Sequence, residues 1–162
     1  SWPNVFMHRD FMPRNLMVAA HGAVERTGTK PSATRLGVLD FQDAVYGPVT
    51  YDITCLFKDA FLSWPPEQVD RWLLDYWEQA RALGLPVQAT FEAFLRASDL
   101  MGVQRHLKVI GIFARICHRD GKPKYLGDVP RFFAYIHKVI ERRPELAVLG
   151  KLLASLPAQE RA

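Results

Sequence analysis

The stretch Val5–Val18 reads VFMHRDFMPRNLMV and decides how the rest of the chain is interpreted. An apolar run, Val5–Met7, leads into the polar segment His8–Arg14, and a second, mostly apolar run, Asn15–Ala19, follows it. Short apolar runs on either side of a turn-forming segment are typical of paired strands. We therefore predict a small β hairpin whose two strands hold the polar segment as a loop of fixed position.

The polar segment contains the spacing H-x-D-x-x-x-x-N, formed by His8, Asp10 and Asn15. In phosphotransfer sites with this pattern, the Asp accepts the proton of the acceptor hydroxyl and the Asn holds a magnesium ion. A further strand-like run, Leu36–Phe41, ends in Asp40-Phe41-Gln42 and resembles a D-F-G magnesium site. Oxygen ligands of this kind suit magnesium. The pattern predicts Asp10 as the catalytic base and Asn15 and Asp40 as metal ligands.

The composition is that of one ordinary globular domain. The chain has 162 residues, of which 49% are hydrophobic and 12% aromatic, enough to build a core. Its formal net charge of +4 is mild, and we expect no nucleic-acid partner. No run approaches the ~18 apolar residues of a membrane span and no signal peptide is visible, so we expect a cytoplasmic protein without a membrane partner. Cys55 and Cys117 lie far apart and are expected to be buried free thiols.

From Thr50 onward the apolar pattern has the helical period. We expect Thr50 and Asp128 to act as N-caps, with Asp52 in the first turn of the first helix. The predicted helices cover 50–62, 67–83, 90–117 and 128–142, with a last one opened by Pro144. The third is either one long helix or two, with Gly102 and Gly111 as candidate break points. The segments between are an exposed hairpin loop (20–35), an irregular segment (42–49) and a charged loop (118–127). The predicted fold class is α+β, mostly α.

Three stretches, 8–18, 37–57 and 104–126, resemble the protein-kinase-like family of aminoglycoside phosphotransferases and choline kinases. The resemblance implies ATP and Mg2+ as cofactors and the fold of a kinase-like C-terminal lobe, in which a small β hairpin carries the catalytic loop and a helical bundle follows. Residues 1–157 would form this catalytic and substrate lobe, and 158–162 a frayed tail. The glycine-rich loop and strand lysine of an ATP-binding lobe cannot fit before Val5, so the N-terminal lobe of the same protein would be a missing partner.

The resemblance also implies roles for residues around the loop. His8 would brace the loop, and Asp52 would support it from the neighbouring helix. The candidates for substrate contacts are Asp43, Arg14, Arg105 and His106. Asp43 is equally suited to cap a turn. Arg105 and His106 lie among apolar residues of a predicted helix, where a cleft contact and an ordinary ion pair are equally good explanations.

A small-molecule acceptor is favoured over a protein acceptor. Asp40 and Asp52 are only 12 residues apart, too few for a kinase activation loop, and no A-P-E follows. Within the family, the three stretches resemble kinases that phosphorylate an amino sugar, such as N-acetylmuramate or N-acetylglucosamine, at the anomeric hydroxyl in cell-wall sugar recycling. The alternatives are a kinase of aminoglycosides or choline-type alcohols, whose cationic substrates call for an acidic pocket, and an inactive folding or interaction lobe.

Overall fold

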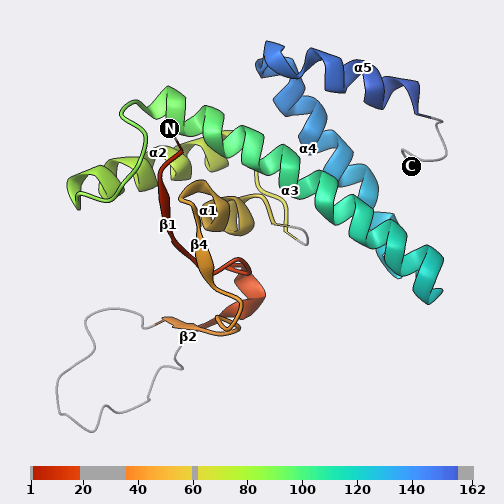
Figure 1. Ribbon diagram of the computed structural model, residues 1–162, viewed down its shortest axis with the longest axis horizontal. Coiled ribbons are helices and arrows are strands. Elements are labelled where there is room, and N and C mark those ends of the chain that lie inside the picture. The colour runs from red at the N-terminus through yellow and green to blue at the C-terminus, as the bar shows by residue number, and fades with distance from the viewer. Residues whose placement is uncertain (1, 19–35, 60–61, 157–162) are drawn as a thin grey trace, which may run out of the picture.

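The computed structural model describes residues 2–18, 36–59 and 62–156. The described chain is mostly helical with small antiparallel β pairs near its N-terminus, which confirms the predicted α+β class. Figure 1 shows the β segments at one side of the molecule and the helices stacked beyond them. The predicted hairpin loop at 20–35 and the predicted frayed tail at 158–162 lie outside the described residues.

The strands form two separate pairs. β1 (Asn4–Met7) pairs with β4 (Val45–Pro48), and β2 (Leu16–Val18) pairs with β3 (Leu36–Val38), both antiparallel. The predicted hairpin between the two runs that flank the loop is therefore wrong, as is the irregular assignment of 42–49. The loop is instead held between strands of different pairs.

The local backbone explains this pairing. Between β1 and β2 the chain passes through Arg9, at a φ of 76°, and through the 3-10 turn η1 (Pro13–Asn15), so that β2 leaves in a new direction. Gly47 in β4 lies so close to Met7 that an added Cβ would be 2.7 Å from the methionine Cε. The absence of a side chain at Gly47 thus leaves room for the end of the Met7 side chain over β4.

The helices pack around one long central helix. They are α1 (Thr50–Phe57), α2 (Pro66–Ala82), α3 (Phe91–Asp120), α4 (Val129–Arg142) and α5 (Ala147–Ser155), with 3-10 turns η2 (Pro123–Asp128) and η3 (Pro144–Leu146). Figure 1 shows α3 crossing the molecule, with α1 and α2 toward its N-terminal part and α4 against its C-terminal part. Two buried apolar clusters follow this division, one centred on Phe94 and Leu73 and the other on Phe132 and Ile136.

Of the two predicted possibilities for the third helix, the structure shows a single unbroken helix, α3. Its C-terminal end lies three residues beyond the predicted one. The Thr90 hydroxyl accepts a hydrogen bond from the Ala93 N–H at 3.3 Å and caps its start, and Gly121, at a φ of 64°, ends it. Gly102 does not break the helix. A Cβ there would lie 3.3 Å from Cδ of Lys58, so the glycine makes room for that side chain.

Two predicted caps are wrong. The residue before α1, Val49, is already helical, and the Thr50 hydroxyl has no hydrogen-bond partner among the described residues. Asp128 likewise has helical dihedrals and accepts a hydrogen bond from the Arg131 guanidinium at 2.9 Å instead of capping α4. An N-cap side chain reaches the first-turn N–H groups from an extended residue, which neither site provides. The first helix also ends at Phe57 rather than near residue 62.

The two cysteines differ in burial. Cys55 is fully buried, but Cys117 is only half-buried, so the prediction of two buried thiols is correct for one of them. None of the helices in the described ranges combines the length and the apolar character needed to cross a bilayer.

Candidate active site

The loop between β1 and β2 is clamped by the first turn of α1. The Asp52 carboxylate accepts a hydrogen bond from the His8 N–H at 2.6 Å and one from the Arg9 N–H at 2.9 Å. Arg9 sits in the left-handed region, which a residue with a side chain adopts only at a cost. The charge-assisted hydrogen bonds from the His8 and Arg9 N–H groups to Asp52 hold Arg9 in this conformation. The clamp fixes the direction in which the chain enters Asp10.

The structural hydrogen bonds of Asp10 involve its backbone N–H and carbonyl groups rather than its carboxylate. Its N–H donates to Nδ1 of His8 at 3.3 Å, and its carbonyl accepts from the Asn15 side-chain amide at 2.9 Å and from the Met12 N–H at 2.9 Å. No hydrogen bond from another described residue reaches the half-buried Asp10 carboxylate. A carboxylate in this state can accept a proton from an incoming hydroxyl.

His8 supports the loop from its side. Because Nδ1 accepts the Asp10 N–H, the neutral ring carries its proton on Nε2, which is buried without a hydrogen-bond partner among the described residues. The ring packs edge-on against Phe11, with centroids 6.0 Å apart. These contacts suit a positioning role.

The β2–β3 ladder brings Asn15 and Asp40 to the same end of the site. The Leu39 N–H donates to the Asn15 carbonyl at 2.9 Å, and Asp40 follows directly at a φ of 67°. The predicted strand over 36–41 therefore ends at Val38, and Asp40 begins a turn in which its Oδ1 accepts from Gln42 at 3.2 Å.

The oxygen donors at this end fit a magnesium ion. The Asn15 amide nitrogen donates to the Asp10 carbonyl, its oxygen accepts no hydrogen bond from another described residue, and the Asp40 carboxylate is exposed. The described residues contain no group of three or more His, Cys, Asp or Glu placed to bind a metal. One carboxylate and one amide are nevertheless the kind of sparse protein set that magnesium uses when phosphates and waters supply its other ligands.

The four residues predicted to contact substrate do not form one group. Asp43 is exposed and its carbonyl accepts a hydrogen bond from the Arg9 guanidinium at 3.3 Å, which places it beside the loop. Arg14 is exposed in η1, with Nε 3.1 Å from the Met12 sulfur. Arg105 is buried against α1, donates to the Tyr51 hydroxyl at 3.3 Å and stacks on that ring.

His106 points away from Arg105 and from the loop. Its Nε2–H donates to the Lys58 carbonyl at 3.3 Å, and its ring stacks on Tyr135 with centroids 5.1 Å apart. The structure thus gathers Asp10, Asn15, Asp40 and Asp43 around the loop and places His106 in a pocket between helices.

Cys55 is a loop contact that the sequence reading did not identify. Its thiol donates to the Arg9 carbonyl at 3.4 Å, so α1 holds both the N–H and the C=O of that residue. Burial raises the pKa of Cys55 to about 12, which keeps the thiol protonated as a donor. Cys55 lies three residues after Asp52 and therefore on the same helix face, and this spacing could have indicated that it also contacts the loop.

His106 is expected to make stability depend on pH. Burial lowers the pKa of His106 to about 4, against an ordinary value near 6.5. Between these values the unfolded chain binds a proton that the folded chain does not, so stability falls as the pH is lowered from about 6.5 to 4, by roughly 2–3 kcal/mol. Urea unfolding at several pH values measures the loss.

His106→Gln provides the comparison for this titration. Glutamine can still donate to the Lys58 carbonyl but does not titrate, and the carboxylates that titrate in the same range are common to both proteins. The difference in unfolding free energy between wild type and variant should change across this pH range. Parallel curves would contradict the assignment of a buried neutral histidine.

The fold and the loop together place this chain in a class, the protein-kinase-like phosphotransferases. The chain corresponds to the mostly helical lobe of these proteins. Within that class, the chain belongs to the phosphotransferase enzyme family, APH, whose sequence model matches residues 1–94.

Relatives of known name cover nearly the whole chain. It is 71% identical over 160 residues to the N-acetylmuramate/N-acetylglucosamine kinase of Pseudomonas putida, covering 99% of the chain and 43% of the relative. The enzymes of the same name from Pseudomonas aeruginosa and Neisseria meningitidis are 64% identical over 155 residues and 49% identical over 158 residues. These alignments cover 96% and 98% of the chain, and 42% and 43% of the two relatives. The chain thus spans less than half the length of the curated relatives it matches.

Proposed function

We propose that this chain is the catalytic and acceptor-binding lobe of an ATP- and magnesium-dependent kinase that phosphorylates the anomeric hydroxyl of an amino sugar. The observation that carries the proposal is the Asp52-clamped loop, which leaves the Asp10 carboxylate available beside Asn15 and Asp40. The names of the relatives supply the substrate class, N-acetylmuramate or N-acetylglucosamine. The product, a sugar 1-phosphate, fits cell-wall sugar recycling in the cytoplasm, where ATP and magnesium are at hand.

Each group at the site receives a role in this proposal. The acceptor oxygen attacks the γ-phosphorus of ATP, the bond to the ADP oxygen breaks, and Asp10 takes the hydroxyl proton. Asn15 and Asp40 would hold magnesium, whose charge neutralises the phosphate oxygens. Arg14 lies within the loop and is assigned to the transferred phosphate. Asp43, beside Arg9, is assigned to the sugar hydroxyls.

The direct test is phosphorylation by the full-length protein. Incubation with ATP, magnesium and either amino sugar should yield a sugar 1-phosphate, identified by 31P NMR and by its lability to mild acid. An aminoglycoside and choline serve as competing acceptors. Phosphorylation of those two alone, or of none of the four, would overturn the proposal.

The Asp52 clamp should be needed for rate. Asp52→Ala removes the acceptor of both loop N–H groups and lets Asp10 shift, and a misplacement near 1 Å costs roughly 10²-fold. We expect kcat of the full-length enzyme to fall about 10- to 100-fold. Asp75→Ala, an exposed aspartate of α2, is the control. Equal kcat for the two variants would refute the clamp.

The two β pairs and the turn after β3 expose apolar side chains, which we together call the ribbon surface: Phe6, Tyr46, Val18, Leu36 and Phe41. Phe6 and Tyr46 are cross-strand partners, each 75% exposed, and the partners Val18 and Leu36 are also exposed. Single exposed apolar residues are ordinary, but several of them on two short strand pairs give a reason to expect a covering partner. We assign the ribbon surface to contact with an N-terminal ATP-binding lobe, since the relatives are more than twice as long as the aligned region.

Substitution distinguishes a covered ribbon surface from an exposed one. Phe6→Ser in the full-length protein should lower the free energy of unfolding by about 2 kcal/mol, because a covered aromatic ring returns to water. Val148→Ser, at a site 79% exposed on α5, is the matched control and should change it by less than about 0.5 kcal/mol. Denaturant unfolding measures both. A Phe6→Ser effect as small as the control would mean that this surface is solvent-exposed in the whole protein.

A further inference from the structure

A pocket lies where the end of α1, the start of α2 and the middle of α3 and α4 meet. Its cavity volume is about 110 Å3, and it opens to solvent on one side. Lys58, the residue after α1, lines it, whereas none of Asp10, Asn15 and Asp40 does. Since Asp52 clamps the loop at the opposite end of α1, the pocket and the phosphotransfer residues lie at opposite ends of that helix.

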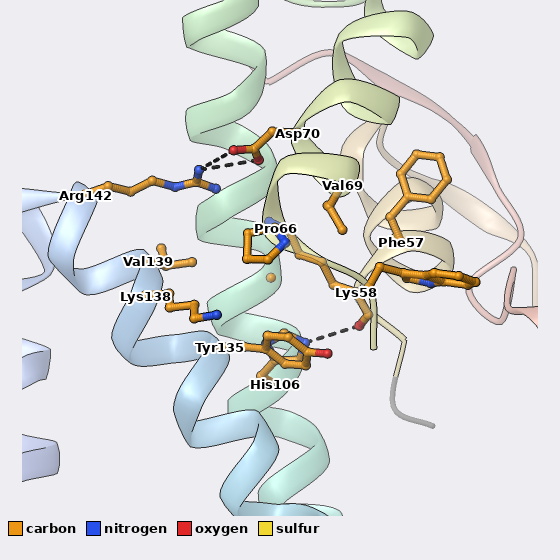
Figure 2. A pocket seen from close by; sticks show the side chains of 12 residues that line it. Phe57, Lys58, Pro66, Val69, Asp70, His106, Tyr135, Lys138, Val139 and Arg142 are labelled. Atoms are coloured by element: carbon orange, nitrogen blue, oxygen red, sulfur yellow. Dashed lines mark hydrogen bonds and ion pairs between the residues drawn. The ribbon is translucent and has the colours of Figure 1, made fainter. Parts of the chain in front are cut away.

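The walls of this pocket present rings and apolar groups. Tyr135 stacks on His106 at an interplanar angle of 22°, and its hydroxyl is hydrogen-bonded to Ser63 at 2.6 Å, which fixes the ring. Trp64 lines the pocket, is 40% exposed, and rests edge-on against Trp72. Figure 2 shows Tyr135 and His106 stacked beneath Lys138 and facing Lys58. A ligand with a flat ring or apolar body finds matching surfaces here.

The charges of the pocket do not cancel. Lys58, Lys138 and Arg142 line it, against one lining carboxylate, Asp70, which pairs with Arg142 at 3.1 Å. Asp99 lies behind the wall and pairs with Lys58 at 3.2 Å. Asp99 also pairs with Arg143, which in turn pairs with Glu92, so four cations against three carboxylates leave one positive charge in excess.

Lys138 carries that excess. No hydrogen bond or ion pair joins its ammonium group to another described residue, and Figure 2 shows it directed from α4 into the pocket. Because Lys138 is exposed to solvent, its attraction for an anion is partly screened, and a ligand gains most when its ring or apolar body also contacts the neighbouring walls. A phosphate monoester, with nearly two negative charges, would exceed the single positive charge available, whereas a carboxylate matches it.

We propose that this pocket binds a small organic carboxylate, with its ring or apolar body among Tyr135 and Trp64 and its carboxylate on Lys138. The carboxylate has two sources, a separate metabolite or the acceptor itself, because N-acetylmuramate carries a lactyl carboxylate that N-acetylglucosamine lacks. Carboxylate binding in this pocket does not depend on the proposed kinase activity; only the acceptor as its source rests on that proposed function.

Benzoate and its neutral analogue benzamide are the probes. In ligand-observed NMR titrations of the full-length protein, benzoate should bind at least tenfold more tightly than benzamide. Lys138→Gln should weaken benzoate binding about tenfold and leave benzamide unchanged. Lys151→Gln, which removes an exposed lysine of α5, is the control and should change neither. Lys138 is exposed at the surface of α4, so the variant should fold, which unchanged circular dichroism verifies.

Equal affinity for benzoate and benzamide, or equal benzoate affinity in wild type and Lys138→Gln, would overturn the proposal. Competition then identifies the source of the carboxylate. Displacement of benzoate by N-acetylmuramate but not by N-acetylglucosamine supports the acceptor as the occupant. Bound benzoate that neither sugar displaces supports a separate carboxylate metabolite. The kinase assay without benzoate reports independently on the proposed function.

Discussion

Replacing Asp10 with alanine is expected to lower kcat of the full-length enzyme at least about 10³-fold without unfolding it. A positioned general base contributes about 10²- to 10⁴-fold, and the same carboxylate also orients the acceptor hydroxyl. Stability should be preserved because the structural hydrogen bonds of Asp10 involve its backbone N–H and carbonyl, which alanine retains. Single-turnover phosphorylation of the sugar measures the rate, and urea unfolding measures the fold.

Asp10→Asn refines this test. The amide has the shape of the carboxylate and can orient a hydroxyl, but it cannot accept the proton, so its rate should remain close to that of Asp10→Ala. Asp75→Ala again serves as the distant control. Residual turnover above about a tenth of wild type in either Asp10 variant would refute the assigned base.

Local sequence was sufficient where neighbouring residues determine structure. The loop spacing from His8 to Asn15 and the apolar period of α2 are local signals, and the structure contains both the turn and the helix. Strand pairing was not predictable in this way. β1 finds its partner about 40 residues away, and two short apolar runs with a turn between them describe a hairpin equally well.

The positions of two candidate site residues were also not predictable from local sequence. Arg105 and His106 are adjacent and were assigned together, but successive residues on an α-helix point about 100° apart. Arg105 therefore faces Tyr51 near the loop, while His106 faces Lys58 and Tyr135 in the pocket. Their separation depends on where α1 and α4 pack, which is tertiary information that the sequence pattern does not carry.

Asp99 is the clearest feature that no local pattern indicated. It lies in the N-terminal third of α3, is completely buried, and binds cations from two other parts of the chain. Its Oδ1 accepts from Lys58 at 3.2 Å and also from Arg142, and its Oδ2 accepts from Nε of Arg143 at 2.8 Å. Burial lowers the pKa of Lys58, and the Asp99 carboxylate opposes this shift. One carboxylate thus joins the end of α1 and the end of α4 to the central helix.

Asp99→Asn should therefore destabilise the protein by about 3–5 kcal/mol, although it changes little in volume. The substitution leaves the largely buried Lys58 and Arg143 without their shared charge, and removing one partner of a buried ion pair costs far more than the pair contributes. Glu145→Gln breaks the exposed ion pair with Arg96 and should leave the free energy of unfolding almost unchanged. Urea unfolding of both variants decides the matter, because similar small losses would mean that the three cations find water or other partners when the carboxylate is gone.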